Sequence, residues 1–77
     1  MKYNLKPIVQ KIMNILHKEG FEIKRFRGSH ISINRNPPLM RPIIIPNKKE
    51  LSNAVRNNLL RELKEVGIDT KKIEELF

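Results

Sequence analysis

The spacing of apolar residues changes twice along this chain, after Gly20 and again after Pro46, and these changes restrict the folds available to it. Before Gly20, apolar residues recur every three or four positions, which places them on one face of a helix. Residues 21–45 instead alternate with period two and are rich in β-branched side chains, which indicates short strands. Helical spacing returns after Pro46. This order predicts an α+β domain.

The ends of the first helix are marked by residues with special backbone properties. We expect Asn4 to cap its start, Pro7 to occupy its first turn and Gly20 to end it. Its apolar stripe consists of Leu5, Ile8, Val9, Ile12, Met13 and Leu16. His17 borders this stripe and is expected to be a boundary residue.

A second helix is predicted to end at Gly67. Its start is left open, because Asn47 with Glu50 resembles a capping box while Ser52 or Asn53 matches the cap position equally well. Its apolar stripe consists of Val55, Leu59, Leu60, Leu63 and Val66. A short terminal helix, capped by Asp69 or Thr70, is expected to offer Ile73, Leu76 and Phe77 to the core.

Three strands are expected over residues 21–27, 30–35 and 41–45. Gly28-Ser29 makes the first turn, and Asn36-Pro37-Pro38 makes the second because prolines cannot donate to a strand ladder. Strands joined this tightly form an antiparallel meander, whose apolar face the helices must cover. The prediction is one domain, residues 1–77, folded as a two-layer sandwich of order α-β-β-β-α(-α).

The second strand alternates cleanly between its two faces. Ile31 and Ile33 share one face, whereas His30, Ser32 and Asn34 share the other. We therefore expect His30 to point away from the core, on an open sheet face with the basic residues of the turn at its edge.

Charge is concentrated in the first two thirds of the chain. The net charge is +8, and residues 1–49 hold eleven Lys or Arg against Glu19 and Glu22, whereas residues 50–77 hold five against six acids. A polyanion, most commonly a nucleic acid, is the expected partner, and a solvated basic surface is the alternative. The chain has no cysteine and no long apolar run, so we expect a cytoplasmic protein without membrane contact or thiol chemistry.

Three chemical roles can be considered for His30. Two isolated histidines without a carboxylate cluster do not predict a metal site, and no cofactor is expected. A nucleophilic pair with Ser29 is disfavoured, because adjacent strand residues point to opposite faces and a hydrogen bond between them is not expected. Acid–base catalysis on RNA is the economical option, since RNA carries its own 2′-hydroxyl nucleophile and imidazole titrates near neutrality.

Cationic side chains would then stabilise the charge of the transition state. The expected RNA-binding residues are Lys24, Arg25, Arg27, Gly28, Ser29, Lys48 and Lys49, with Gly28 permitting the tight turn that brings a phosphate close. From these residues alone, a plain phosphate or base contact by His30 is favoured over catalysis.

Several motifs occur here in a specific order. A helix ending in HKEGFEIKRFRGSH, a strand ISINR, the proline-ended strand RPIIIP and a helix closing on EVGID resemble the HicA family of bacterial and archaeal toxins. The resemblance covers nearly the whole chain. Where many members carry a second histidine after the proline-ended strand, this chain has Pro46-Asn47-Lys48-Lys49.

The resemblance implies a fold similar to double-stranded RNA-binding domains and the activity of an mRNA interferase toxin, an endoribonuclease. It also implies that His30, in the Gly28-Ser29-His30 motif, is catalytic and is covered by a HicB-type antitoxin protein. Two alternatives remain: a non-catalytic RNA-binding module of the double-stranded RNA-binding type, and a scaffold for an acidic protein partner.

Overall fold

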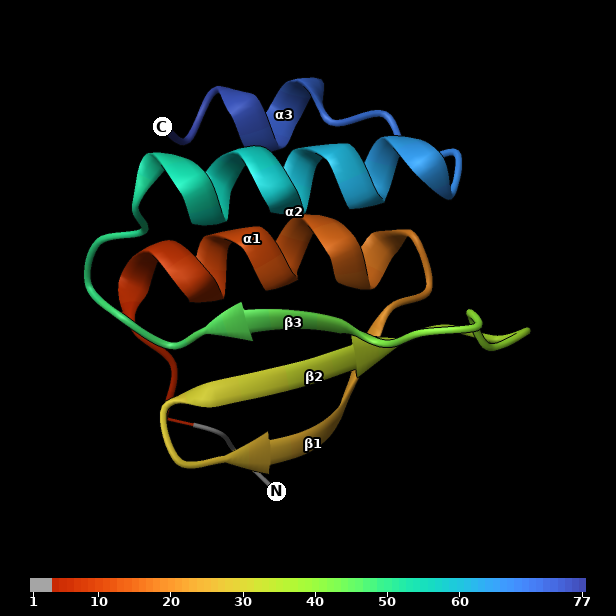
Figure 1. The fold of residues 1–77 in the computed structure, drawn as a ribbon, viewed down its shortest axis with the longest axis horizontal. Coiled ribbons are helices and arrows are strands. Elements are labelled where there is room, and N and C mark those ends of the chain that lie inside the picture. Colours follow the sequence, from red (N-terminus) through yellow and green to blue (C-terminus); the bar gives the residue numbers. More distant parts are fainter. Residues whose placement is uncertain (1–3) are drawn as a thin grey trace.

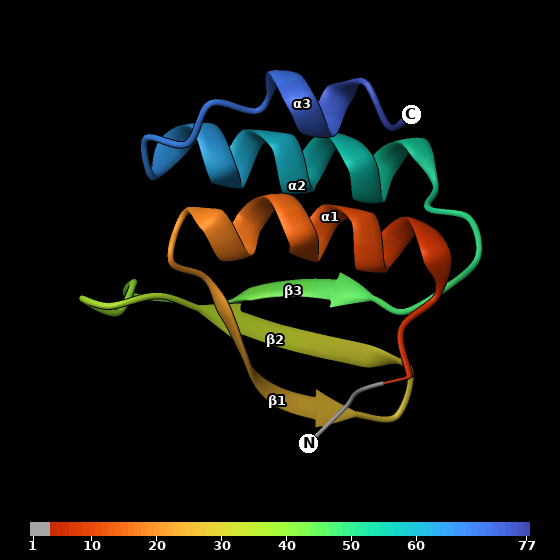
Figure 2. The ribbon, with the colours of Figure 1, turned by 180° about the vertical axis from the view of Figure 1, so that it is seen from behind.

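The computed structural model describes residues 4–77, which form a three-stranded antiparallel sheet with helices packed against one face (Figures 1 and 2). The elements follow in the order α1 (Pro7–Lys18), β1 (Glu22–Arg27), β2 (His30–Asn34), β3 (Ile43–Pro46), α2 (Asn53–Glu65) and α3 (Lys71–Glu74). The strands are ordered β1-β2-β3, so each pairs with its neighbour in sequence. The predicted α+β class and antiparallel meander are therefore confirmed.

The start of α1 differs from the expectation. Lys6, not Asn4, occupies the N-cap position, and no side chain on α1 caps the helix. Asn47 instead reaches back from the segment after β3, where its Oδ1 accepts a hydrogen bond from the Lys6 amide at 2.8 Å. The prediction for Asn4 was wrong because the acceptor comes from a residue 41 positions away, which local sequence cannot indicate.

The open question about α2 is settled in favour of Ser52. Its hydroxyl accepts a hydrogen bond from the Val55 amide at 3.2 Å, the usual contact of an N-cap serine. Thr70 is the N-cap of α3, while the Asp69 carboxylate accepts a bond from the Lys71 amide. Both residues that were expected as possible caps, Asp69 and Thr70, thus contribute to the start of this short helix.

Phe77 does not join the core. Its side chain is 39% exposed, and its ring lies 5.5 Å from the guanidinium carbon of Arg56 on α2. Ile73 is fully buried and Leu76 is half-buried, so the terminal helix supplies one complete core residue. The expectation for Phe77 failed because the chain ends on the outer surface of α2, where a cation can cover the ring.

The core lies between the sheet and the helices and is almost wholly aliphatic. Its fully buried side chains are Val9, Ile12, Leu16, Phe21, Ile31, Ile33, Ile45, Leu63 and Ile73. The alternation expected for β2 is confirmed, because Ile31 and Ile33 are buried whereas His30 is exposed. Packing of both helical stripes on one sheet face leaves the opposite face uncovered by helices.

Arg35, directly after β2, fixes the sheet to the C-terminal end of α2. Its Nη2 donates to the carbonyl oxygen of Val66 at 2.9 Å, and its guanidinium carbon lies 5.4 Å from the Phe21 ring centroid. A cation at a helix C-terminus satisfies a carbonyl that has no partner within the helix. The basic residue at this position therefore has a structural role rather than a place on the open face.

Two adjacent isoleucines on β3 test which sheet face carries the stability. Ile45 is 0% exposed, whereas Ile44 is 50% exposed on the opposite face. Ile45→Ala should lower the free energy of unfolding by about 2–5 kcal/mol, the usual cost of such a core truncation. Ile44→Ala should cost under about 1 kcal/mol. Urea denaturation of both variants checks this, and equal losses would contradict the assigned faces.

Candidate nucleic-acid interface

Strand β1 contains a bulge that controls which side chains reach the open face. The ladder with β2 is regular except for a shift between Ile23 and Arg25, so Lys24 is the extra residue. The paired positions are Ile23 with Ile33, Arg25 with Ser32, Phe26 with Ile31 and Arg27 with His30. In a regular strand, Arg25 would share the core face with Ile23. The bulge instead places Arg25 and Arg27 on the same face as His30.

The basic residues of the turn were expected at the edge of the sheet, and the bulge was not predicted. A signal for it is present, because Phe26 follows Ile23 by three positions, and residues three apart in a regular strand point to opposite faces. Both are paired with buried isoleucines of β2, and a regular strand cannot direct both toward one face. An extra residue between them resolves the conflict.

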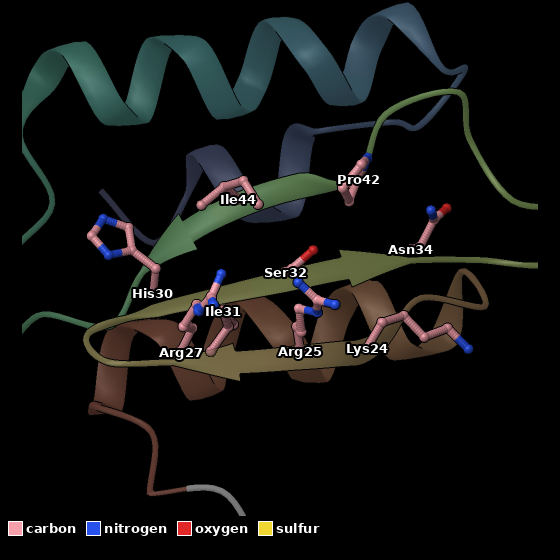
Figure 3. Close-up of a pocket in the computed structure, with 9 residues that line it drawn as sticks. All are labelled: Lys24, Arg25, Arg27, His30, Ile31, Ser32, Asn34, Pro42 and Ile44. Atoms are coloured by element: carbon pink, nitrogen blue, oxygen red, sulfur yellow. The ribbon is translucent and has the colours of Figure 1, made fainter.

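The open face carries a hollow of about 590 Å³ (Figure 3). One side is formed by the cationic residues Lys24, Arg25 and Arg27 of β1. The other side is formed by Ile44 of β3 and by Pro42, which directly precedes this strand. The hollow therefore has a basic side and an apolar side.

The central strand β2 lines the rest of the hollow, with Ile31 and with three residues of its open face. His30 lies at one end of the hollow, Ser32 in the middle and Asn34 at the other end (Figure 3). His30 is paired with Arg27 on one side and with Pro46 on the other. The imidazole therefore stands where the basic strand and the hairpin turn meet.

The positive charge of the hollow is only partly neutralised. Lys24 Nζ lies 3.5 Å from a carboxylate oxygen of Glu22, and both side chains are more than half exposed, so this pair is weak. Within residues 4–77, neither Arg25 nor Arg27 forms an ion pair. Two guanidinium groups thus remain free to bind an anion, and guanidinium matches phosphate geometry well.

The turn before His30 depends on Gly28. Arg27 and His30 are paired, so Gly28 and Ser29 form a two-residue hairpin loop. Gly28 has φ +57°, whereas Ser29 has a negative φ, and this pattern of signs is that of a type II′ turn. Glycine adopts positive φ without steric cost, which explains its presence directly before the Ser29-His30 pair.

The expectation that Ser29 would not contact His30 was wrong. Ser29 Oγ lies 3.4 Å from His30 Nδ1. Ser29 belongs to the turn rather than to the strand, so the alternation rule that separates neighbouring side chains does not apply to it. This contact leaves Nε2 as the ring nitrogen available to a substrate.

Asn47 holds the hairpin turn against the start of α1. Its amide donates to the Ser29 carbonyl at 2.6 Å, while its side chain bonds the Lys6 amide and the Asn4 carbonyl. The local sequence predicts Asn47 only as a possible helix cap. It is better described as the link that fixes the segment bearing His30.

The other predicted RNA-binding residues lie outside the hollow. Lys48 and Lys49 are exposed, but they follow Asn47 and do not line the hollow. Because Asn47 is bonded to Ser29, both lysines begin close to the hairpin turn. Their contact with RNA remains a prediction.

Gly28→Ala tests the turn. An added Cβ would meet no atom within 4 Å, so the expected loss of about 1–2 kcal/mol arises from the backbone conformation alone. Gly28→Asn is the matched control and should lose less, because asparagine tolerates positive φ. Thermal denaturation measures both variants. Unchanged stability in Gly28→Ala would contradict the turn geometry.

Comparison with protein-family models, with curated proteins and with solved structures finds no match. Among residues 4–77, no helix has the length and apolar character needed to cross a bilayer. Within the same residues, no three His, Asp or Glu side chains gather where they could hold a metal ion. Function is therefore inferred from the geometry of the open face and from the motifs of the sequence.

Proposed function

We propose that the protein is a metal-independent endoribonuclease, an mRNA interferase of the kind that its resemblance to HicA toxins implies. One observation carries the proposal: an exposed imidazole stands at the end of a hollow in which the other ionisable side chains contributed by residues 4–77 are all cationic. RNA is the polyanion that such a site can cleave without a metal, because it contains its own nucleophile.

The reaction follows from the chemistry of the RNA backbone. His30 removes the proton of a 2′-hydroxyl, and this oxygen attacks the adjacent phosphorus. The bond from phosphorus to the 5′-oxygen breaks, and the leaving oxygen takes a proton. Among residues 4–77, no carboxyl group lines the hollow, so the protonated imidazole is the group that returns this proton. The products are a 2′,3′-cyclic phosphate end and a 5′-hydroxyl end.

Arg25 and Arg27 hold the phosphate during this reaction. Arg27 is paired with His30 across the hairpin, and Arg25 follows on the same face. Negative charge grows on the phosphate oxygens in the transition state, and fixed cations that face those oxygens lower its free energy. Lys24, Lys48 and Lys49 extend the basic surface along the RNA backbone.

Two further parts of the proposal rest on the resemblance. The order α1-β1-β2-β3-α2 agrees with a fold related to double-stranded RNA-binding domains. A HicB-type antitoxin would cover His30, and the two unpaired guanidinium groups would favour an acidic surface on that partner.

A non-catalytic RNA-binding module is the second candidate function. It is favoured because, among the described residues that line the hollow, His30 is the one imidazole and no carboxyl group accompanies it. Such a module would use the same cations to bind phosphates, and its affinity would fall steeply with salt concentration.

Replacement of His30 separates the two candidates. His30→Ala should abolish cleavage of a long single-stranded RNA in EDTA while RNA affinity falls only slightly. His17→Ala is the matched control, because His17 is the other histidine and is exposed at the end of α1. It should cut RNA at the normal rate. Wild-type protein that binds RNA without cutting it would establish the binding module instead.

Ser29→Ala tests whether the hydroxyl beside His30 positions the imidazole. Loss of one hydrogen bond should lower kcat roughly two- to tenfold and leave KM nearly unchanged. Ser29→Thr keeps the hydroxyl and should restore kcat. A change in KM alone, or no rescue by threonine, would mean that Ser29 acts only in the turn.

A further inference from the structure

The apolar side of the hollow is not explained by phosphate binding. Ile44 is 50% exposed on the open-face side of the edge strand β3, and Pro42 is exposed just before this strand. Both line the hollow opposite the cations of β1 (Figure 3). Phosphate groups bind to the cations of β1 and do not use these apolar side chains on the other side of the same hollow.

We infer that Ile44 and Pro42 form a seat for one base of single-stranded RNA, next to the phosphate on which His30 acts. The inference rests on the proposed function, because it assigns a base subsite to the same RNA-binding face. A nucleotide has an anionic phosphate and an apolar base face. These two parts match the basic side and the apolar side of the hollow. The hollow's volume of about 590 Å³ is within the usual range for small-ligand sites.

The register of the sheet sets the distance between the seat and the reacting group. Ile44 is paired with Ser32, and Ser32 with Arg25, so these three residues form one row across the open face. His30 and Arg27 form the next row on that face. A base on Ile44 would therefore place its own phosphate near Arg25 and the adjacent phosphate near His30.

Two polar side chains of β2 lie at the edge of this seat. Asn34 Oδ1 accepts hydrogen bonds from the amides of Arg35 and Leu39, at 2.9 and 2.8 Å, which fixes the orientation of the amide group. Its Nδ2 is then the group left to donate to a ligand. Ser32 offers a hydroxyl between Asn34 and His30. Such groups hydrogen-bond the edges of an unstacked base.

Single-stranded RNA is favoured over duplex RNA by the same features. In a duplex the base faces are stacked on one another and cannot contact Ile44. A protein segment with acidic residues is the other class of occupant that a basic and apolar hollow could accept. It would not depend on a nucleobase, and this difference makes the two distinguishable.

The experiment combines base removal with removal of the isoleucine side chain. A fluorescent single-stranded RNA of twelve nucleotides is titrated with His30→Ala protein, and a set of RNAs each carries one abasic nucleotide at a different position. Abasic nucleotides keep every phosphate, so charge is constant. The same titrations are made with the His30→Ala/Ile44→Ala double variant, and with His30→Ala/Met40→Ala as the matched control. Met40 is fully exposed and lies outside the hollow.

Ile44→Ala should weaken binding of the intact RNA roughly three- to tenfold, the size expected from one lost apolar contact with a base. Removal of one particular base should weaken binding by a similar factor when Ile44 is present. The same removal should have almost no effect on binding by the Ile44→Ala protein. This non-additivity is the signature of direct contact. The Met40→Ala control should behave like the protein with only His30 replaced, and a matched RNA duplex should bind without sensitivity to Ile44.

The proposed base seat would be overturned if the effects of base removal and of Ile44→Ala on RNA affinity were additive at every position. It would also be overturned if Ile44→Ala weakened the binding of duplex and single-stranded RNA equally. Cleavage by the wild-type protein, measured separately, distinguishes this failure from failure of the proposed function. If the protein cuts RNA through His30 but the effects are only additive, the proposed function stands and the base seat is overturned. Coupling between one base and Ile44 in a protein that never cuts RNA keeps the seat and overturns the catalytic assignment.

Discussion

The register of β2 against its two neighbours is the constraint on which both the core and the open face depend. Ile31 and Ile33 are buried because the residues paired with them on β1 and β3 are apolar and lie on the same face of the sheet. A slip by one residue would expose both isoleucines and bury His30. The burial of the aliphatic core therefore also fixes the direction in which the imidazole points.

The bulge at Lys24 makes the sequence of β1 compatible with that register. The register places both Ile23 and Phe26 on the core side, although they are three positions apart. One extra residue between them is therefore needed. A consequence of the extra residue is that both Lys24 and Arg25 line the hollow, although they are adjacent in sequence. The strand thus presents more positive charge to one face than regular alternation would allow.

Local sequence signals were sufficient for the elements and for the exposure of His30. Period-two spacing in β2, proline in the first turn of α1, and glycine after α1 and α2 all act within a few residues, and each was confirmed. The two contacts of the Asn47 side chain join segments more than forty residues apart, and nothing in the local pattern indicates them. The contact between Ser29 and His30 was missed for another reason, because a strand rule was applied to a turn residue.

The site itself could be predicted as a set of residues but not as a hollow with two unlike sides. Cations, the histidine and the glycine turn were all visible in the motif from Arg25 to His30. Ile44 was read as one more strand residue, because the sequence does not reveal that its alternate position faces solvent beside the basic strand.

The segment after β3 limits how a single imidazole can work here. Asn47 is already committed to three hydrogen bonds that tie the hairpin turn to α1, so it cannot move toward a substrate without releasing the support of His30. Lys48 and Lys49 are the next residues, and neither lines the hollow. Their ammonium groups can hold a phosphate of the RNA backbone beside the site. Both proton transfers of the proposed reaction therefore fall to His30, and the hydrogen bond that orients its ring gains importance accordingly.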